Sequence, residues 1–173
     1  MSNNFEFSRP IDVHRLRPAG GAYEIAASLL ECAALAKRFD LLTLDRLEAR
    51  VQLTAIAGGF YRLSAALQAD LTQSCVVTLE PVKSRVAEEF ALLYGAVDEQ
   101  KEVVLDGNSE TVEPIEGGMI DIGEAVAQQL SLALDPFPRA PGAPAPSDTP
   151  ASESQRLDSP FAVLAKLHKS EGS

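Results

Sequence analysis

The chain has 173 residues and a formal net charge of −10, with 25 acidic residues against 15 basic ones. It contains no apolar run close to the roughly 20 residues that a membrane-spanning helix needs, and its first ten residues lack the basic start and apolar middle of a signal peptide. We therefore expect a cytoplasmic protein that has no membrane partner. The two cysteines, Cys32 and Cys75, fit neither a disulfide framework nor the spacing of a metal-binding pair.

The N-terminal segment alternates apolar and polar residues. Phe5, Phe7 and Ile11 are separated by polar positions, and prolines follow at 10 and 18. This pattern predicts a short strand that adds to the edge of a sheet. His14 lies in the same stretch without a Cys, His or acidic partner at a spacing that would make it a metal ligand or a base, so we interpret it as a surface residue.

Basic residues near this strand form a candidate RNA-binding patch. Phosphate contacts are made chiefly by arginine and lysine, although stacking aromatic residues, which strengthen such a site, are missing here. The candidate residues are Arg9, Arg15, Arg17, Arg46 and Arg50.

The period becomes helical from residue 23 to residue 39. Ile25, Leu29, Cys32 and Ala36 share one stripe, and Lys37 lies near the C-terminal end, where a cation suits the helix dipole. The pattern predicts an amphipathic helix that covers the sheet.

Three alternating segments follow and predict the sheet itself. Residues 47–55 and a long run over 63–81 alternate apolar and polar positions, and Gly58-Gly59 supplies a hairpin turn between them. The long run is expected to bend near Gln73. Residues 85–94 predict a third strand, although Phe90–Tyr94 also suits a helix. Because one face of each strand is polar, we expect a mainly antiparallel meander built on residues 44–95.

An acidic band covers residues 98–124. It contains nine carboxylates against Lys101 alone, a net charge of −8. Such a surface repels phosphates and attracts a basic protein partner, although many charge runs serve only as a solvated surface. The candidate partner-binding residues within it are Glu99, Glu102, Glu110 and Glu113.

Residues 111–134 predict a short extended segment and then a second helix. Asp121 and Glu124 have the spacing of a capping box, and Ile122, Val126 and Leu130 follow at intervals of four, so we expect a helix over 121–134. Glu113, Glu116 and Asp121 together suggest a metal or acid/base site, but nothing pairs them with a nucleophile. We therefore expect no catalytic residue, no cofactor and no small-molecule substrate.

The C-terminal part combines a linker with a short helical motif. Residues 139–157 are rich in Pro, Ala and Ser and predict a flexible linker. Residues 158–169 predict a short helix that begins at Ser159-Pro160. Such a short helix is marginal alone and must dock, either on its own domain or on a partner, through Phe161, Leu164 and Leu167.

Three stretches, in order, resemble the YceD-like family of large ribosomal RNA subunit accumulation proteins. They are TQSCVVTLEPV at 72–82, VEPIEGGMIDIGEAVAQQLSLALDPFP at 112–138 and SPFAVLAKL at 159–167. The resemblance implies a non-enzymatic role in the synthesis, processing or accumulation of 23S ribosomal RNA.

The resemblance also bears on metal binding. Many members of this family carry two cysteines three residues apart on the central strand, and further cysteines after the second helix, a layout that suggests zinc. Here Cys75 matches the first position, Thr78 occupies the second, and residues 136–143 contain no thiol. We expect no structural metal, and we interpret Cys75 as a packed apolar residue on the core face of the central strand, beside Val77 and Leu79.

The sequence thus predicts an α+β domain over residues 5–138, in which an antiparallel sheet is covered by two helices, followed by the linker and the terminal helix. Two functions stay open. One is a factor that binds a basic ribosomal protein or a large-subunit precursor through the acidic band and the terminal helix. The alternative is a protein that contacts 23S ribosomal RNA directly through the arginine patch.

Overall fold

The computed structural model describes residues 5–17, 19–95, 103–105 and 108–144. The chain divides into two compact units, 1–141 and 142–173, and every helix and strand described below belongs to the first. The first unit therefore ends three residues after the predicted domain boundary at 138. No helix in the described part of the chain has the length and hydrophobicity needed to cross a bilayer.

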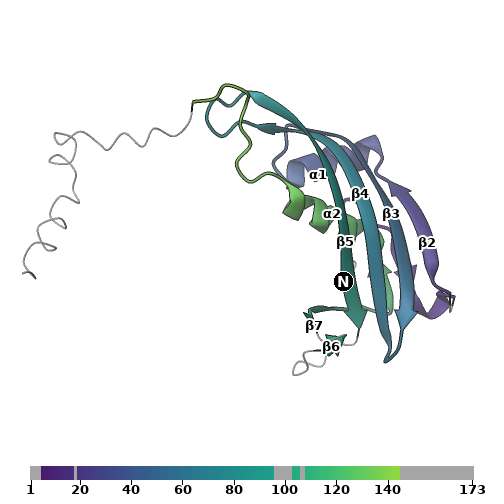
Figure 1. Ribbon diagram of the computed structural model, residues 1–173. Helices are drawn as coiled ribbons and strands as arrows, with labels where there is room; N and C mark the ends of the chain where they lie inside the picture. The colour runs from purple at the N-terminus through teal and green to yellow at the C-terminus, as the bar shows by residue number, and fades with distance from the viewer. Residues whose placement is uncertain (1–4, 18, 96–102, 106–107, 145–173) are drawn as a thin grey trace, which may run out of the picture. The chain divides into compact units, whose positions relative to one another are not determined.

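A five-stranded sheet with the order β2-β3-β4-β5-β8 forms the framework (Figure 1). Its strands are β2 (Gly21–Ala26), β3 (Thr43–Ile56), β4 (Phe60–Ser74), β5 (Pro81–Gly95) and β8 (Val112–Pro114). Strands β2 to β5 form a meander of antiparallel neighbours, and β8 pairs parallel with Leu93–Gly95 of β5. The predicted α+β class and the mainly antiparallel sheet are confirmed.

The turn between β3 and β4 contains the predicted pair of glycines. Gly58 and Gly59 have φ angles of +84° and +80°, a region that glycine adopts without steric cost. The tight turn places Ile56 opposite Phe60 and allows the two long strands to pair along their length. The hairpin prediction is therefore confirmed.

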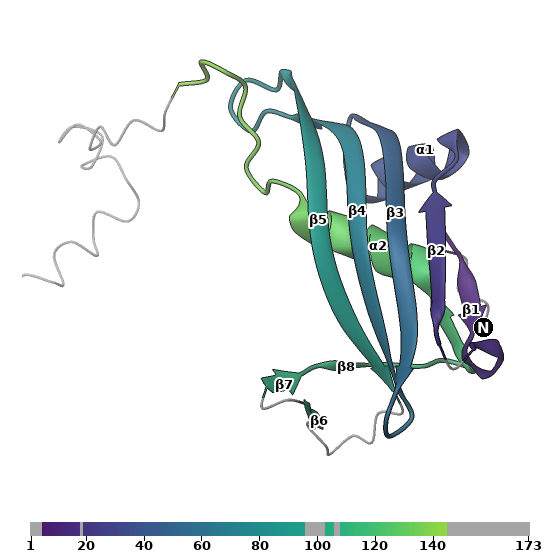
Figure 2. The ribbon, with the colours of Figure 1, turned by 45° about the vertical axis from the view of Figure 1, so that its right-hand side comes forward.

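Both helices cover one face of the sheet (Figure 2). Helix α1 (Leu29–Arg38) packs mainly against β3, and helix α2 (Ile122–Ala133) packs against β4 and β5. Their buried side chains join the inward-facing leucines of β3 and β4 in one core. The fully buried leucines from the two strands are Leu47, Leu53, Leu63, Leu67 and Leu71.

The predicted helix over 23–39 is correct only in its second half. Residues 21–26 form strand β2, and the helix begins after Ser28, whose side chain caps Glu31 in a complete capping box. Leu29 and Leu30, expected on the buried stripe, are 83% and 84% exposed, whereas Leu35 is fully buried. Pairing of Gly21–Ala26 with β3 outweighs the helical periodicity of these residues.

Two further predictions need correction. The central strand does not continue to residue 81 through a bend, because it ends at Ser74 and residues 75–80 form a turn in which Leu79 has a φ of +62°. The N-terminal strand β1 (Pro10–Asp12) does not extend the main sheet. It pairs instead with β9 (Met119–Asp121) in a separate two-stranded sheet.

Three short elements complete the described structure. Val13–Arg15 forms a 3₁₀ turn after β1. Strands β6 (Val103–Leu105) and β7 (Asn108–Glu110) form a small antiparallel pair between β5 and β8 in the sequence. The predicted helix over 121–134 is confirmed as α2, with Asp121 as its N-cap.

Candidate functional site

The face of the sheet opposite the helices carries a network of ion pairs between strands. The Asp70 carboxylate on β4 accepts hydrogen bonds from Arg46 of β3 at 2.9 Å and from Arg85 of β5 at 2.7 Å. On β2 and β3, Arg50 donates to Glu24 at 3.1 Å. Opposite charges facing each other across strands stabilise the pairing modestly. The network makes this open face polar and close to electrically balanced.

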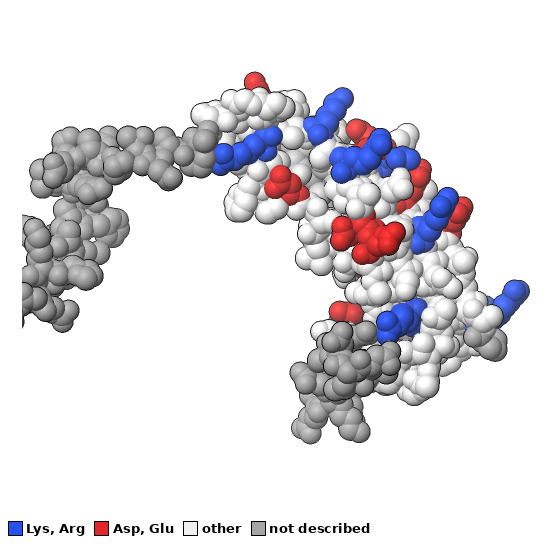
Figure 3. All heavy atoms as spheres, in the orientation of Figure 1, with Lys and Arg blue, Asp and Glu red and all other residues white. Residues whose placement is uncertain are grey.

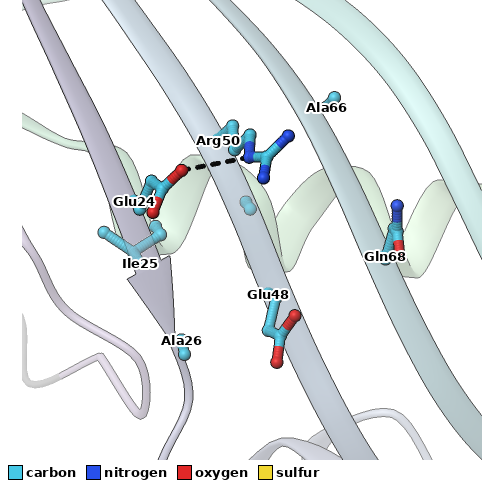
Figure 4. A pocket seen from close by; sticks show the side chains of 8 residues that line it. Glu24, Ile25, Ala26, Glu48, Arg50, Ala66 and Gln68 are labelled. Atoms are coloured by element: carbon cyan, nitrogen blue, oxygen red, sulfur yellow. Dashed lines mark hydrogen bonds and ion pairs between the residues drawn. The ribbon is translucent and has the colours of Figure 1, made fainter.

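A groove of about 360 Å³ runs across this face over β2, β3 and β4. Ala26 and Ala66 line it with small side chains, and Arg50, Glu48 and Gln68 project around it (Figure 4). The α2 ribbon lies on the other side of the strands in the same view. The groove therefore presents alternating charges and short side chains to whatever binds this face.

The five arginines of the predicted RNA-binding patch do not form one uncompensated basic surface. Four of them have a carboxylate partner within 3.3 Å, and Figure 3 shows lysine, arginine and acidic side chains interspersed over the visible face. The pairs are Arg9 with Glu31, Arg15 with Asp12, Arg46 with Asp70 and Arg50 with Glu24, whereas Arg17 is exposed and has no carboxylate partner among the described residues.

The side chain of Arg9 makes contacts within the fold. Its guanidinium donates to both oxygens of Glu31, at 2.7 and 3.1 Å, and lies 4.7 Å from the centre of the Phe7 ring. The hydrogen bonds from Arg9 lower the pKa of Glu31 to about 2, and bonds from Ser28 contribute further. Arg9 thus joins the N-terminal segment to the first turn of α1.

The acidic band divides into structural and exposed residues. Asp121 accepts backbone hydrogen bonds from Arg9, Gly123 and Glu124. Glu124 is 5% exposed and pairs with Arg38. The band is therefore partly neutralised within the fold, because α1 supplies an arginine from a distant part of the sequence.

Few of the predicted partner-binding residues lie within the described structure. Glu113 is exposed on β8, and its charge adds to the effect of burial that raises the pKa of Tyr94 to about 12. Glu110 belongs to β7, where only the backbone is described. Outside the described residues lie Glu99, Glu102, Phe161, Leu164 and Leu167.

Cys75 is buried, but its surroundings are polar. It follows the end of β4, and its sulfur accepts N–H hydrogen bonds from Val77 and Thr78 at 3.4 Å and from Ala140 at 3.3 Å. The hydroxyl of Thr78 and these N–H groups lower the pKa of Cys75 to about 6. The burial of Cys75 is confirmed, but its placement on the core face of the central strand is wrong, because β4 ends at Ser74 and the sulfur accepts backbone hydrogen bonds in the turn that follows.

The residues around Cys75 do not fit a zinc site of the kind that the cysteine layout of many family members suggests. Zinc in a structural site takes four Cys or His ligands, and among the described residues no three His, Cys, Asp or Glu side chains are grouped to hold a metal ion. Backbone N–H groups occupy the lone pairs of the single sulfur. A hydrogen bond of 2.9 Å from Val76 to the carbonyl of Pro138 joins the same two segments directly.

Sequence reasoning missed the apolar surface beside Cys75. Leu79 and Phe137 are 77% and 71% exposed, and Val76 and Val77 are about half exposed. The assignment of 75–81 to a strand concealed it, because alternation placed Val77 and Leu79 on the core face. The alternation ends with β4 at Ser74, and Leu79 adopts a positive φ in the turn that follows.

A family model described as "Large ribosomal RNA subunit accumulation protein YceD" matches residues 63–168, more than half of the chain. The match begins within β4 and includes β5, β8, α2 and the residues that follow. No curated protein and no solved structure matches the chain.

Proposed function

The chain belongs to the YceD family, and from this premise we propose that it is a non-enzymatic cytoplasmic factor in the synthesis, processing or accumulation of 23S ribosomal RNA. The description of the family implies a role in the accumulation of large-subunit ribosomal RNA. In our proposal, the chain acts by binding a large-subunit precursor or a basic ribosomal protein, without converting a small-molecule substrate.

One observation favours a protein partner over direct contact with RNA. Four of the five candidate arginines are already paired with carboxylates, so a phosphate that approached them would have to displace those partners. The pairing also places negative charge beside each cation, which weakens the attraction of a polyanion. Arg17 alone does not provide the several phosphate contacts on which non-specific RNA affinity depends.

A binding role also agrees with the positions of the carboxylates at the start of α2 and just before it. Asp121 caps α2, and Glu124 holds Arg38. Both groups therefore act within the fold. Glu113 and Glu116 stay exposed, where they can attract a basic partner.

The experiment compares two titrations of the full chain. One uses 23S ribosomal RNA and the other uses purified large-subunit precursor particles, each at several salt concentrations. We expect saturable binding to the particles and only weak binding to the free RNA. Tight binding to the free RNA, with an affinity that falls steeply as salt rises, would favour the alternative of direct RNA binding.

A genetic experiment tests the role itself. Loss of the chain should lower the amount of 23S ribosomal RNA relative to 16S ribosomal RNA in the same cells. An unchanged ratio would contradict the proposed role.

A further inference from the structure

The two long edges of the main sheet differ in how they are protected. At the β2 edge the strand is short, and Arg9 donates a hydrogen bond of 3.2 Å to the carbonyl of Ala26. At the other edge, β8 covers only Leu93–Gly95 of β5. The segment Pro81–Leu92 therefore has no second strand beside it within the described part of the chain (Figure 2).

An open edge of this length presents backbone N–H and C=O groups that can pair with another strand. Val82, Val86 and Phe90 lie half-buried on the helix-covered side of β5. Lys83 and Glu89 are exposed on the opposite side, and neither has an ion pair within the described structure. Within the described structure the edge thus combines apolar side chains with a cation, Lys83, and an anion, Glu89, that lie on the same side of the sheet and have no ion pair.

We propose that β5 pairs antiparallel with β5 of a second copy of this chain, about a two-fold axis at Val86. In this register Lys83 faces Glu89 of the partner subunit, and Val82 faces Phe90 of the partner subunit. The two Val86 side chains meet at the axis. Lys83 and Glu89 therefore each gain an opposite charge, and apolar side chains face apolar side chains.

Neighbouring registers are less complementary. An axis at Arg85, Glu88 or Glu89 places identical charges directly opposite each other, which destabilises a strand pair. An axis at Ala87 opposes Glu88 to the apolar Val86. It also places Arg85 opposite Glu89 of the partner subunit, although Arg85 already binds Asp70 at 2.7 Å.

An independent observation supports the Val86 axis. The Ser84 hydroxyl is the one buried side-chain polar atom without a hydrogen-bond partner among the described residues. In the proposed register Ser84 faces Glu88 of the partner subunit, whose carboxylate can accept a hydrogen bond from it. Glu88 is exposed although it shares the helix-covered side with Val86 and Phe90, and it has no ion pair in the described chain.

The open segment has the length that this register requires. Pro81 faces Ala91 of the partner subunit, so the paired region ends before Leu93, where β8 begins. No existing strand is displaced. The two-fold axis makes the contact self-complementary, so the association closes at a dimer and does not propagate into a fibre.

The test measures the mass of the full chain by sedimentation over a range of concentrations. We expect a monomer–dimer equilibrium for the natural sequence. Lys83→Glu and Glu89→Lys should each weaken dimerisation about tenfold or more, because two like-charged pairs replace two opposite-charged ones. The double variant K83E/E89K should restore it. The matched control is Glu116→Lys, an exposed charge reversal away from β5 that should leave the dimer unchanged.

A second variant keeps the test independent of charge effects on folding. Val86→Cys should form a disulfide-linked dimer under mild oxidation, because facing residues of antiparallel strands bring their Cβ atoms within disulfide range. Ala22→Cys, exposed on β2, serves as the control and should stay largely uncrosslinked.

Three outcomes would overturn the proposal. The natural chain could stay monomeric at every concentration, or the double variant could fail to restore the dimer while its melting curve shows an intact fold. The third outcome is that β5 pairs only with an extended segment of a ribosomal protein, since the second copy would then not be the partner.

Discussion

Arg38, at the C-terminal end of α1, forms a two-pronged ion pair with Glu124 in the first turn of α2. The two N–O distances are 2.7 and 2.9 Å, and Arg38 also donates to Glu6 at 3.0 Å. The hydrogen bonds that Arg38 donates to Glu124 raise the pKa of Arg38. The pair therefore connects the two helices and the N-terminal segment at one point.

Substitution of Glu124 by Ala should reduce the free energy of unfolding by about 1–3 kcal/mol, because it removes a buried carboxylate and its charge-assisted hydrogen bonds with the partly exposed Arg38. Urea denaturation measures the change. Glu116→Ala, at an exposed position, is the control and should change the value by no more than about 0.5 kcal/mol. Similar losses of unfolding free energy in the two variants would contradict the prediction, because the ion pair would then contribute no more than an exposed carboxylate.

The Arg9–Glu31 pair predicts a loss of stability in acid. The pKa of Glu31 is about 2 in the folded chain, against an ordinary value of 4.5. Its contribution to stability is therefore complete above pH 4.5 and is lost as the pH falls towards 2. Unfolding experiments over this range should show a shallower decline for Glu31→Gln than for the natural chain. The control is Glu24→Gln in the exposed Glu24–Arg50 pair; an equal change there would contradict the assignment to Glu31.

Cys75 predicts a second dependence on pH, of the same sign. Its pKa is about 6 in the folded chain, against an ordinary value of 9.0. The folded thiolate thus contributes stability that is fully present above pH 9.0 and lost as the pH falls through 6. Cys75→Ala should remove this change, measured by urea denaturation across that range and by thiolate absorbance. Cys32→Ala is the matched control, because burial raises the pKa of Cys32. A natural chain whose stability is constant over this range would contradict the prediction.

Two truncations locate the end of the first compact unit. The Pro, Ala and Ser content of residues 139–157 by itself predicts that removal of residues 140–173 leaves the melting temperature nearly unchanged. Ala140 is buried, however, and its N–H binds the sulfur of Cys75. Because of this contact, we expect the fragment 1–144 to have a melting temperature close to that of the full chain. The fragment 1–139 should have a lower melting temperature, by about 2–4 °C for each kcal/mol of unfolding free energy that the lost contact contributed. Equal melting temperatures for the two fragments would show that the contact at Ala140 is dispensable.

The acidic band predicts the kinetics of partner binding. Replacement of Glu99, Glu102, Glu110 and Glu113 by Gln should slow association with large-subunit precursor particles and reduce the dependence of that rate on salt. Stopped-flow or surface-based association measurements at low salt test this expectation. The comparison is a variant that carries both Arg15→Gln and Arg17→Gln. If only that variant slows association, the arginines and not the acidic band make the contact.

Local pattern in the sequence was enough to predict the framework of the sheet. Alternation over 47–55, 63–81 and 85–94 predicts strands with one buried and one exposed face, although the second strand ends at Ser74, and Gly58-Gly59 permits the tight turn between the first two strands. The Asp121 cap and the spacing of Ile122, Val126 and Leu130 likewise predicted α2. Each of these signals depends on residues close together in the chain.

Other features depend on which distant segments meet. Tyr23 and Ile25 fit a helix as well as a strand over so short a stretch, and pairing with β3 decides for the strand. Asp70 becomes a shared partner of Arg46 and Arg85 only because the strand register places the three side by side. Glu124 belongs to an acidic run in the sequence, but the fold buries its carboxylate and pairs it with Arg38 of α1. Local sequence cannot decide these cases, because the energy that separates the alternatives comes from contacts between residues far apart in the chain.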